Sequence, residues 1–189
     1  MAGVAGPMFR RNRRDGVRFL TGFAIGQLTS ALFLSVAIIA VGMVVSYILP
    51  WQIRIAVFAA GAILLALADK TGHTPQVARQ VPVDLYHRLE AGPLGFAWGM
   101  DVGLLFTTQK TSSMPWVGLL AATTLLPIGA LPMLMSLSLA SVVSLFIAVI
   151  GWKRNSEWNA KKYFSRLRLL RFTSAALIPT VGVLMVAAQ

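Results

Sequence analysis

The chain has 189 residues, of which 57% are hydrophobic and only 12% are charged. A soluble domain carries about 25% charged and about 45–50% apolar residues, and a chain of this length could not enclose so much apolar surface in a core of its own. The absence of cysteine excludes disulfides, thiolate metal sites and dithiol chemistry. The composition therefore predicts an all-α protein, a polytopic bundle of helices that cross a lipid bilayer.

The positive charge lies outside the apolar segments. The chain has 17 basic and 6 acidic residues, a net charge of +11. Residues 1–18 contain five arginines, and residues 153–171 contain seven basic side chains. Basic flanks of membrane helices are typical of the cytoplasmic side, where they face anionic lipid headgroups. We therefore expect a multi-pass cell-membrane protein with a cytoplasmic N-terminus, with the bilayer and its anionic headgroups as partner and with no nucleic acid.

Apolar segments follow one another along the chain. The first exceeds the roughly 20 residues that cross the hydrocarbon core, and Pro50 ends it. A polar loop at 69–92 precedes the third segment, and Pro127, Gly129 and Pro132 predict a bend between the fourth and the fifth. The six predicted segments are 19–49, 53–68, 93–109, 115–133, 134–151 and 172–188.

Four parts of the chain follow from this pattern. They are a basic cytoplasmic N-terminus at 1–18, a membrane bundle at 19–152, a basic amphipathic interfacial segment at 153–171 and a C-terminal membrane helix at 172–189. Six full crossings would place the basic segment outside the cell, against the usual preference. Either the long first run makes an extra excursion or residues 93–114 are re-entrant, so we expect five to six membrane segments.

An internal repeat starts near residues 22 and 95. Residues 22–33 and 95–106 are identical at six of twelve aligned positions, at a constant offset of 73. Each copy carries small residues at every fourth position, which let membrane helices approach closely. Inverted or parallel repeats of this kind are common in transporters, with a ligand site at the repeat interface. The predicted helix-packing residues are Gly22, Gly26, Ser30, Gly95, Gly99 and Gly103.

Asp101 is the only acid well inside an apolar run. A carboxylate there costs about 2.5–3.5 kcal/mol, so it normally faces a cavity or a partner group. It either contacts an ion, a proton or a substrate, or it is a buried acid held by a neighbouring helix. Thr107 and Lys110 could cradle an anionic group, although an ordinary turn outside the membrane explains them equally well. Gln27 and Thr29 are the matching polar residues of the first copy, and we expect them to bond across helices.

Catalytic and metal-binding patterns are missing from the sequence. It has no Ser-His-Asp order, no metal-ligand spacing and no phosphate-binding glycine loop, so we expect no metal and no cofactor, and an enzyme is the least favoured class. The favoured function is a transporter or permease with a site between the two glycine-rich helices, formed by Asp101, Gln27, Lys110 and Thr107. The alternative is a non-catalytic accessory or assembly subunit that docks on partner subunits, or on a second copy, through the glycine ladders and the basic segment.

The stretches 22–33 and 95–110 resemble the CcdA/DsbD type of membrane domain. That resemblance implies two inverted repeats whose glycine-rich first helices each carry a cysteine that relays electrons. At those places this chain has Thr29, Ser30 and Ala31 in the first copy, and Thr107 and Thr108 in the second. The resemblance therefore implies a shared scaffold without the electron-relay chemistry.

Overall fold

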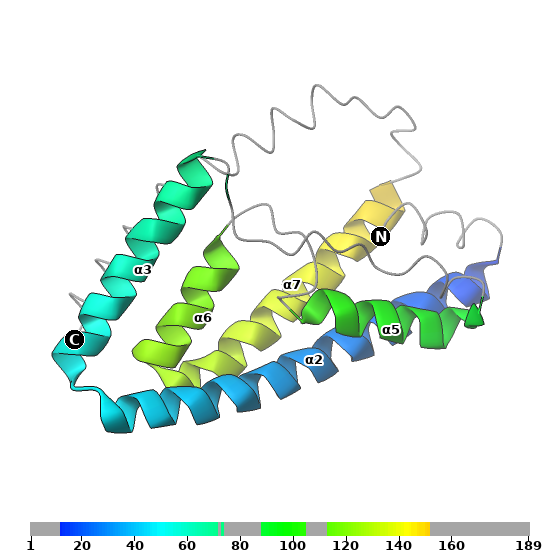
Figure 1. Ribbon diagram of the computed structural model, residues 1–189. Coiled ribbons are helices and arrows are strands. Elements are labelled where there is room, and N and C mark those ends of the chain that lie inside the picture. Colours follow the sequence, from blue (N-terminus) through cyan, green and yellow to red (C-terminus); the bar gives the residue numbers. More distant parts are fainter. Residues whose placement is uncertain (1–11, 72, 74–87, 105–112, 152–189) are drawn as a thin grey trace. The chain divides into compact units, whose positions relative to one another are not determined.

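The computed structural model describes residues 12–71, 73, 88–104 and 113–151 (Figure 1). The described residues form five α-helices and one short 3-10 helix and contain no strand, which confirms the all-α prediction for this part of the chain. The elements in chain order are α2 (Arg13–Ile48), α3 (Trp51–Thr71), α5 (Ala91–Gly103), α6 (Met114–Thr124), η1 (Pro127–Gly129) and α7 (Ala130–Gly151).

Three described helical stretches are long and apolar enough to cross a bilayer: Arg13–Ile48, Trp51–Thr71 and Pro127–Ile147. They indicate a multi-pass membrane protein. The 36 residues of α2 extend over about 54 Å, well beyond a hydrocarbon core of about 30 Å. By contrast, α5 with 13 residues and α6 with 11 are only about 20 and 17 Å long, so neither can cross alone. The basic segment 153–171 and the predicted helix at 172–189 lie outside the described residues.

The ends of some helices do not coincide with the ends of the apolar runs, because local hydrogen bonds determine where a helix starts. The first helix begins at Arg13, six residues before the apolar run. Asn12 stabilises this start, because its Oδ1 accepts the Arg14 N–H (3.1 Å) and its Nδ2 donates to Asp15 (2.8 Å). The third run ends as a helix at Gly103, where residue 104 turns to extended geometry.

The predicted bend between the fourth and fifth segments is confirmed. Here α6 ends at Thr124, and the 3-10 turn of η1 precedes α7. Proline favours the first turn of a new helix but cannot continue an old one, which explains why the interruption falls at Pro127.

The described residues divide into two compact units. The ladder unit contains the N-terminal half of α2 with α5 and most of α7, at residues 12–34, 88–104 and 132–151. The capped unit contains the C-terminal half of α2 with α3, α6 and η1, at residues 35–71, 73 and 113–131. The names refer to the glycine ladders of the first unit and to the charged helix caps of the second.

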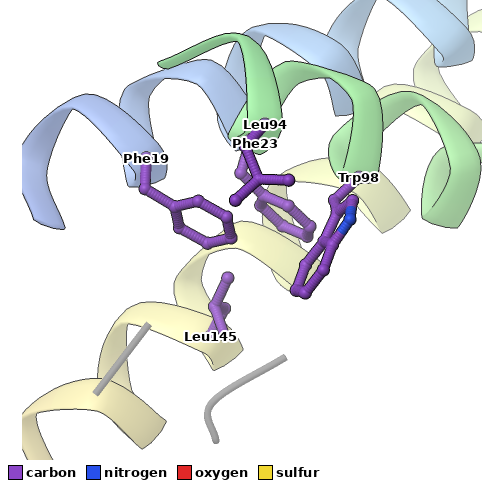
Figure 2. Close-up of a cluster of buried hydrophobic side chains, with 5 residues drawn as sticks. All are labelled: Phe19, Phe23, Leu94, Trp98 and Leu145. Atoms are coloured by element: carbon purple, nitrogen blue, oxygen red, sulfur yellow. The ribbon is translucent and has the colours of Figure 1, made fainter. Parts of the chain in front are cut away.

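Each unit has its own apolar cluster. In the ladder unit, two phenylalanines of α2, two residues of α5 and one leucine of α7 converge, as Figure 2 shows: Phe19, Phe23, Leu94, Trp98 and Leu145. The Phe19 and Trp98 rings meet edge to face, with centroids 5.8 Å apart. In the capped unit, α3 and α6 share a cluster of Phe58, Ala62, Val117, Ala121 and Leu125.

Candidate functional site

The two glycine ladders lie against each other, one on α2 and one on α5. A Cβ added at Gly22 would come closer than 3.0 Å to the carbonyl oxygen of Gly92, and one added at Gly95 would come equally close to that of Phe19. Real Cβ atoms essentially never make such contacts, so a side chain here would force the backbones apart. The two helices touch backbone to backbone, the close approach that small residues permit in membranes.

The same contact recurs one helical turn further along. A Cβ at Gly26 would meet the carbonyl of Phe96, and one at Gly99 would meet the carbonyl of Phe23. Each ladder glycine thus faces the residue three positions before its counterpart in the other helix. Such reciprocal pairing is what a two-fold axis produces. Because the contacts advance in the same direction along both helices, α2 and α5 run parallel.

The ladder contact ends at Gly103, where an added Cβ would collide with the Ser30 hydroxyl. Ser30 is fully buried, and its Oγ donates to the carbonyl of Gln27 (2.9 Å). The structure thus brings together all six residues that the sequence assigns to helix packing.

Gln27 joins α2 to α7 within the ladder unit. Its side chain is buried, at 2% exposure, and its Nε2 donates to the Ser141 hydroxyl (3.3 Å). Its carbonyl also accepts the Ser138 hydroxyl (3.3 Å). The expected bond across helices is present for Gln27 but was wrongly expected for Thr29. The Thr29 hydroxyl donates to the carbonyl of Ile25 in its own helix (2.8 Å), which is the nearest acceptor for a threonine in a helix.

Asp101 lies in the last turn of α5 and is half-buried. At about 100° per residue, it is about 200° around the helix from Gly99 and from Gly103. Asp101 is therefore on the face of α5 away from the ladder contact, not between the two ladders. Its predicted neighbours Thr107 and Lys110 lie outside the described residues.

In the capped unit, α3 and α6 lie side by side and run antiparallel (Figure 1). Asp69 of α3 is almost completely buried, at 1% exposure. Its two carboxylate oxygens accept the backbone N–H of Ser113 at 3.0 and 2.8 Å, and one of them also accepts the Ser113 hydroxyl at 2.6 Å. Ser113 directly precedes α6. A carboxylate therefore caps the N-terminus of α6, where the helix dipole favours negative charge.

Arg54 of α3 binds the opposite end of α6. Its Nη1 donates to the carbonyl of Thr124 (3.3 Å), the last residue of α6, and to the hydroxyl of Ser46 on α2 (2.7 Å). The guanidinium also lies 4.9 Å from the ring centroid of Trp51. One helix, α3, thus supplies a negative charge to the start of α6 and a positive charge to its end, as the dipole of α6 requires.

The sequence reasoning missed the role of both charges. No bond from Asp69 or from Arg54 to another helix was predicted. The sequence does contain one signal for the contact with Asp69. Ser113 followed by Pro115 is a typical helix start, and the end of a buried helix needs polar partners.

Comparison of the chain with protein-family models, with curated proteins and with solved structures gives no match. Among the described residues, no three His, Asp or Glu side chains are grouped so that they could hold a metal ion.

Proposed function

We propose that the chain is a small permease-like membrane protein whose transport site lies in the ladder unit, at the C-terminal end of α5. The observation that carries this proposal is the shortness of α5, which at 13 residues cannot cross the bilayer alone. Interrupted helices are typical of transporters, because their ends present backbone groups and dipole charge at membrane depth. Either a broken span or a re-entrant segment at 93–114 would have this property.

One acidic residue lies at this end of α5, since Asp101 comes two residues before the helix ends. In this proposal Asp101 binds the coupling cation or proton, and Thr107 and Lys110, which follow α5 in the sequence, contact the anionic part of a substrate. Gln27 acts as a positioning residue, since its side chain is engaged with Ser141.

The ladder geometry also bears on the internal repeat. We propose that the N-terminal half of α2 and α5 are two copies of one unit, arranged as a parallel repeat. The reciprocal glycine contacts, at the same offset of 73 that relates the two sequences, support this arrangement. A parallel repeat differs from the inverted one that the CcdA/DsbD resemblance implies, and it would place the starts of both helices on the same side of the membrane.

The alternative function, an accessory subunit, loses one of its two docking surfaces. It would use the glycine ladders to bind partner helices or a second copy, but the ladders face each other within the chain. A surface already filled by the chain's own backbone is not available to a partner. The permease is therefore the function that the geometry favours.

Purified protein in liposomes tests the proposal. Proton entry would be followed with an internal pH dye, and sodium entry with a sodium-selective dye, each under an imposed gradient. We expect wild type to dissipate one gradient, Asp101→Asn to abolish this flux, and the control Asp15→Asn, outside the proposed site, to leave it unchanged. A wild-type protein that passes neither ion would overturn the cation-coupled permease, and an unaltered flux in Asp101→Asn would remove Asp101 from the site.

A further inference from the structure

Three arginines surround an open hollow at the start of α2. The hollow has a volume of about 510 Å³ and is lined by Arg13, Arg14, Val17 and Arg18. All four side chains are exposed. Because α2 is one of the helices long and apolar enough to cross a bilayer, its first two turns fall at the level where lipid headgroups lie.

The positive charge of this hollow is not neutralised within the described residues. No guanidinium of Arg13, Arg14 or Arg18 forms an ion pair or a side-chain hydrogen bond there. The nearby acid, Asp15, instead accepts a hydrogen bond from Asn12 (2.8 Å). Asn12 also caps the first turn through the N–H of Arg14, so the attraction for an anion comes from the guanidinium groups rather than from the helix N-terminus.

An exposed apolar stripe continues from the hollow along the same face of α2. Its members recur at intervals of three, four or eight residues, which keeps them within about a quarter-turn of one another. From its first to its last member the stripe is about 22 Å long, enough for the roughly 15 Å of one bilayer leaflet. Its residues are Val17, Ile25, Leu28 and Leu32, all more than a third exposed.

We infer that this face of α2 is a binding site for one anionic phospholipid. Its phosphate is held by the guanidinium groups of Arg14 and Arg18, one turn apart on the helix, and by Arg13 beside them. The planar guanidinium suits two parallel hydrogen bonds to phosphate oxygens. The acyl chains lie along the stripe that starts at Val17. This inference needs α2 in the membrane but does not depend on transport.

Native mass spectrometry of the full chain in non-ionic detergent tests the inference. The added probes are dioleoylphosphatidylglycerol and dioleoylphosphatidylcholine, which share acyl chains and differ in headgroup charge. We expect wild type to bind the phosphatidylglycerol more tightly than the phosphatidylcholine. The double variant Arg14→Gln with Arg18→Gln should weaken that binding by on the order of 25-fold, about fivefold for each lost charge, and leave the choline lipid unaffected.

Two controls keep the outcome decisive. Lys161→Gln with Lys162→Gln removes the same charge elsewhere, and an equal loss of binding there would show general attraction and overturn the site. Arg14→Lys with Arg18→Lys keeps the charge but not the guanidinium shape, and should lose part of the affinity. Inorganic phosphate at millimolar concentration should not displace the lipid. If it does, the hollow is a simple anion site and the lipid assignment is wrong.

Discussion

The ladder unit and the capped unit join their helices by opposite means. In the ladder unit, α2 and α5 touch because side chains are absent, with glycines of each helix against carbonyl groups of the other. In the capped unit, α3 and α6 are joined by charged side chains of α3 that bind the two ends of α6. Lipid tails are as apolar as leucine, so apolar burial alone gives little drive for either contact.

The two kinds of contact are disrupted by different kinds of substitution. A backbone contact has no room for an added atom, whereas a charged cap depends on the group that is already there. The ladder unit should therefore be disrupted by additions and the capped unit by deletions. Substitutions of both kinds can break or sharpen this contrast.

The largest effect is expected for Gly99→Ala. Its new methyl group would collide with the carbonyl of Phe23, which cannot move without shifting α2, and overpacking of this kind costs about 3 kcal/mol. Gly92→Ala is the matched control, because a Cβ there meets nothing within 4 Å. Unfolding by SDS titration in mixed micelles measures both variants, and equal stability of Gly99→Ala and Gly92→Ala would contradict the backbone contact.

Asp69→Ala should come next, with a loss of about 2 kcal/mol, because the buried N–H and hydroxyl of Ser113 would lose their acceptor. Asp69→Asn keeps one acceptor oxygen and should lose less. Asp15→Asn changes an acid that is only half-buried and should shift the unfolding free energy by less than about 0.5 kcal/mol. The capped unit would need a different account if Asp69→Ala unfolded at the wild-type denaturant concentration.

Arg54→Gln should lose about 1.5 kcal/mol, since it removes the charged donor to Ser46 and to the carbonyl of Thr124. Arg54→Lys keeps the positive charge at the end of α6 and should retain part of the difference. The same SDS titration measures both variants. If lysine proved no better than glutamine, the charge at this helix end would contribute nothing.

The smallest effect is expected for Gln27→Met, which places at position 27 the residue found at the aligned position, Met100. The substitution removes one hydrogen bond to Ser141, worth about 1 kcal/mol. Ion flux in liposomes should be lowered but not lost, because Gln27 is a positioning residue in the proposed mechanism and does not itself bind the ion. Complete loss of flux with unchanged stability would instead make it part of the transport site.

How far the sequence predicts the molecule differs between the two units. The ladder pattern was predictable, because small residues at every fourth position let membrane helices pack closely, and the six expected residues do meet. The contacts of the capped unit could not be predicted from the sequence. An acid at the end of an apolar run gives the same sequence pattern whether it faces water or caps another helix. Pairing Asp69 with Ser113 requires knowing which helices are neighbours.

The proposed site, too, could be predicted from the sequence only in part. The sequence selected Asp101 for its charge in an apolar run, and its role in transport stays a prediction. The sequence could not show on which side of the ladder Asp101 lies. Only the contacts of Gly99 and Gly103 fix the face of α5 that meets α2.

The central claim is that α2 and α5 run parallel in a protein that crosses the membrane. Cysteine labelling tests it most directly, since the chain has no cysteine. Single cysteines at Arg14, Gln52 and Arg88 would be labelled with a membrane-impermeant maleimide in intact and in lysed cells. Because α2 and α3 can each cross the bilayer and α5 runs parallel to α2, positions 14 and 88 should react only after lysis and position 52 in intact cells. Reaction of positions 14 and 88 from opposite sides would contradict the parallel ladder and the topology built on it.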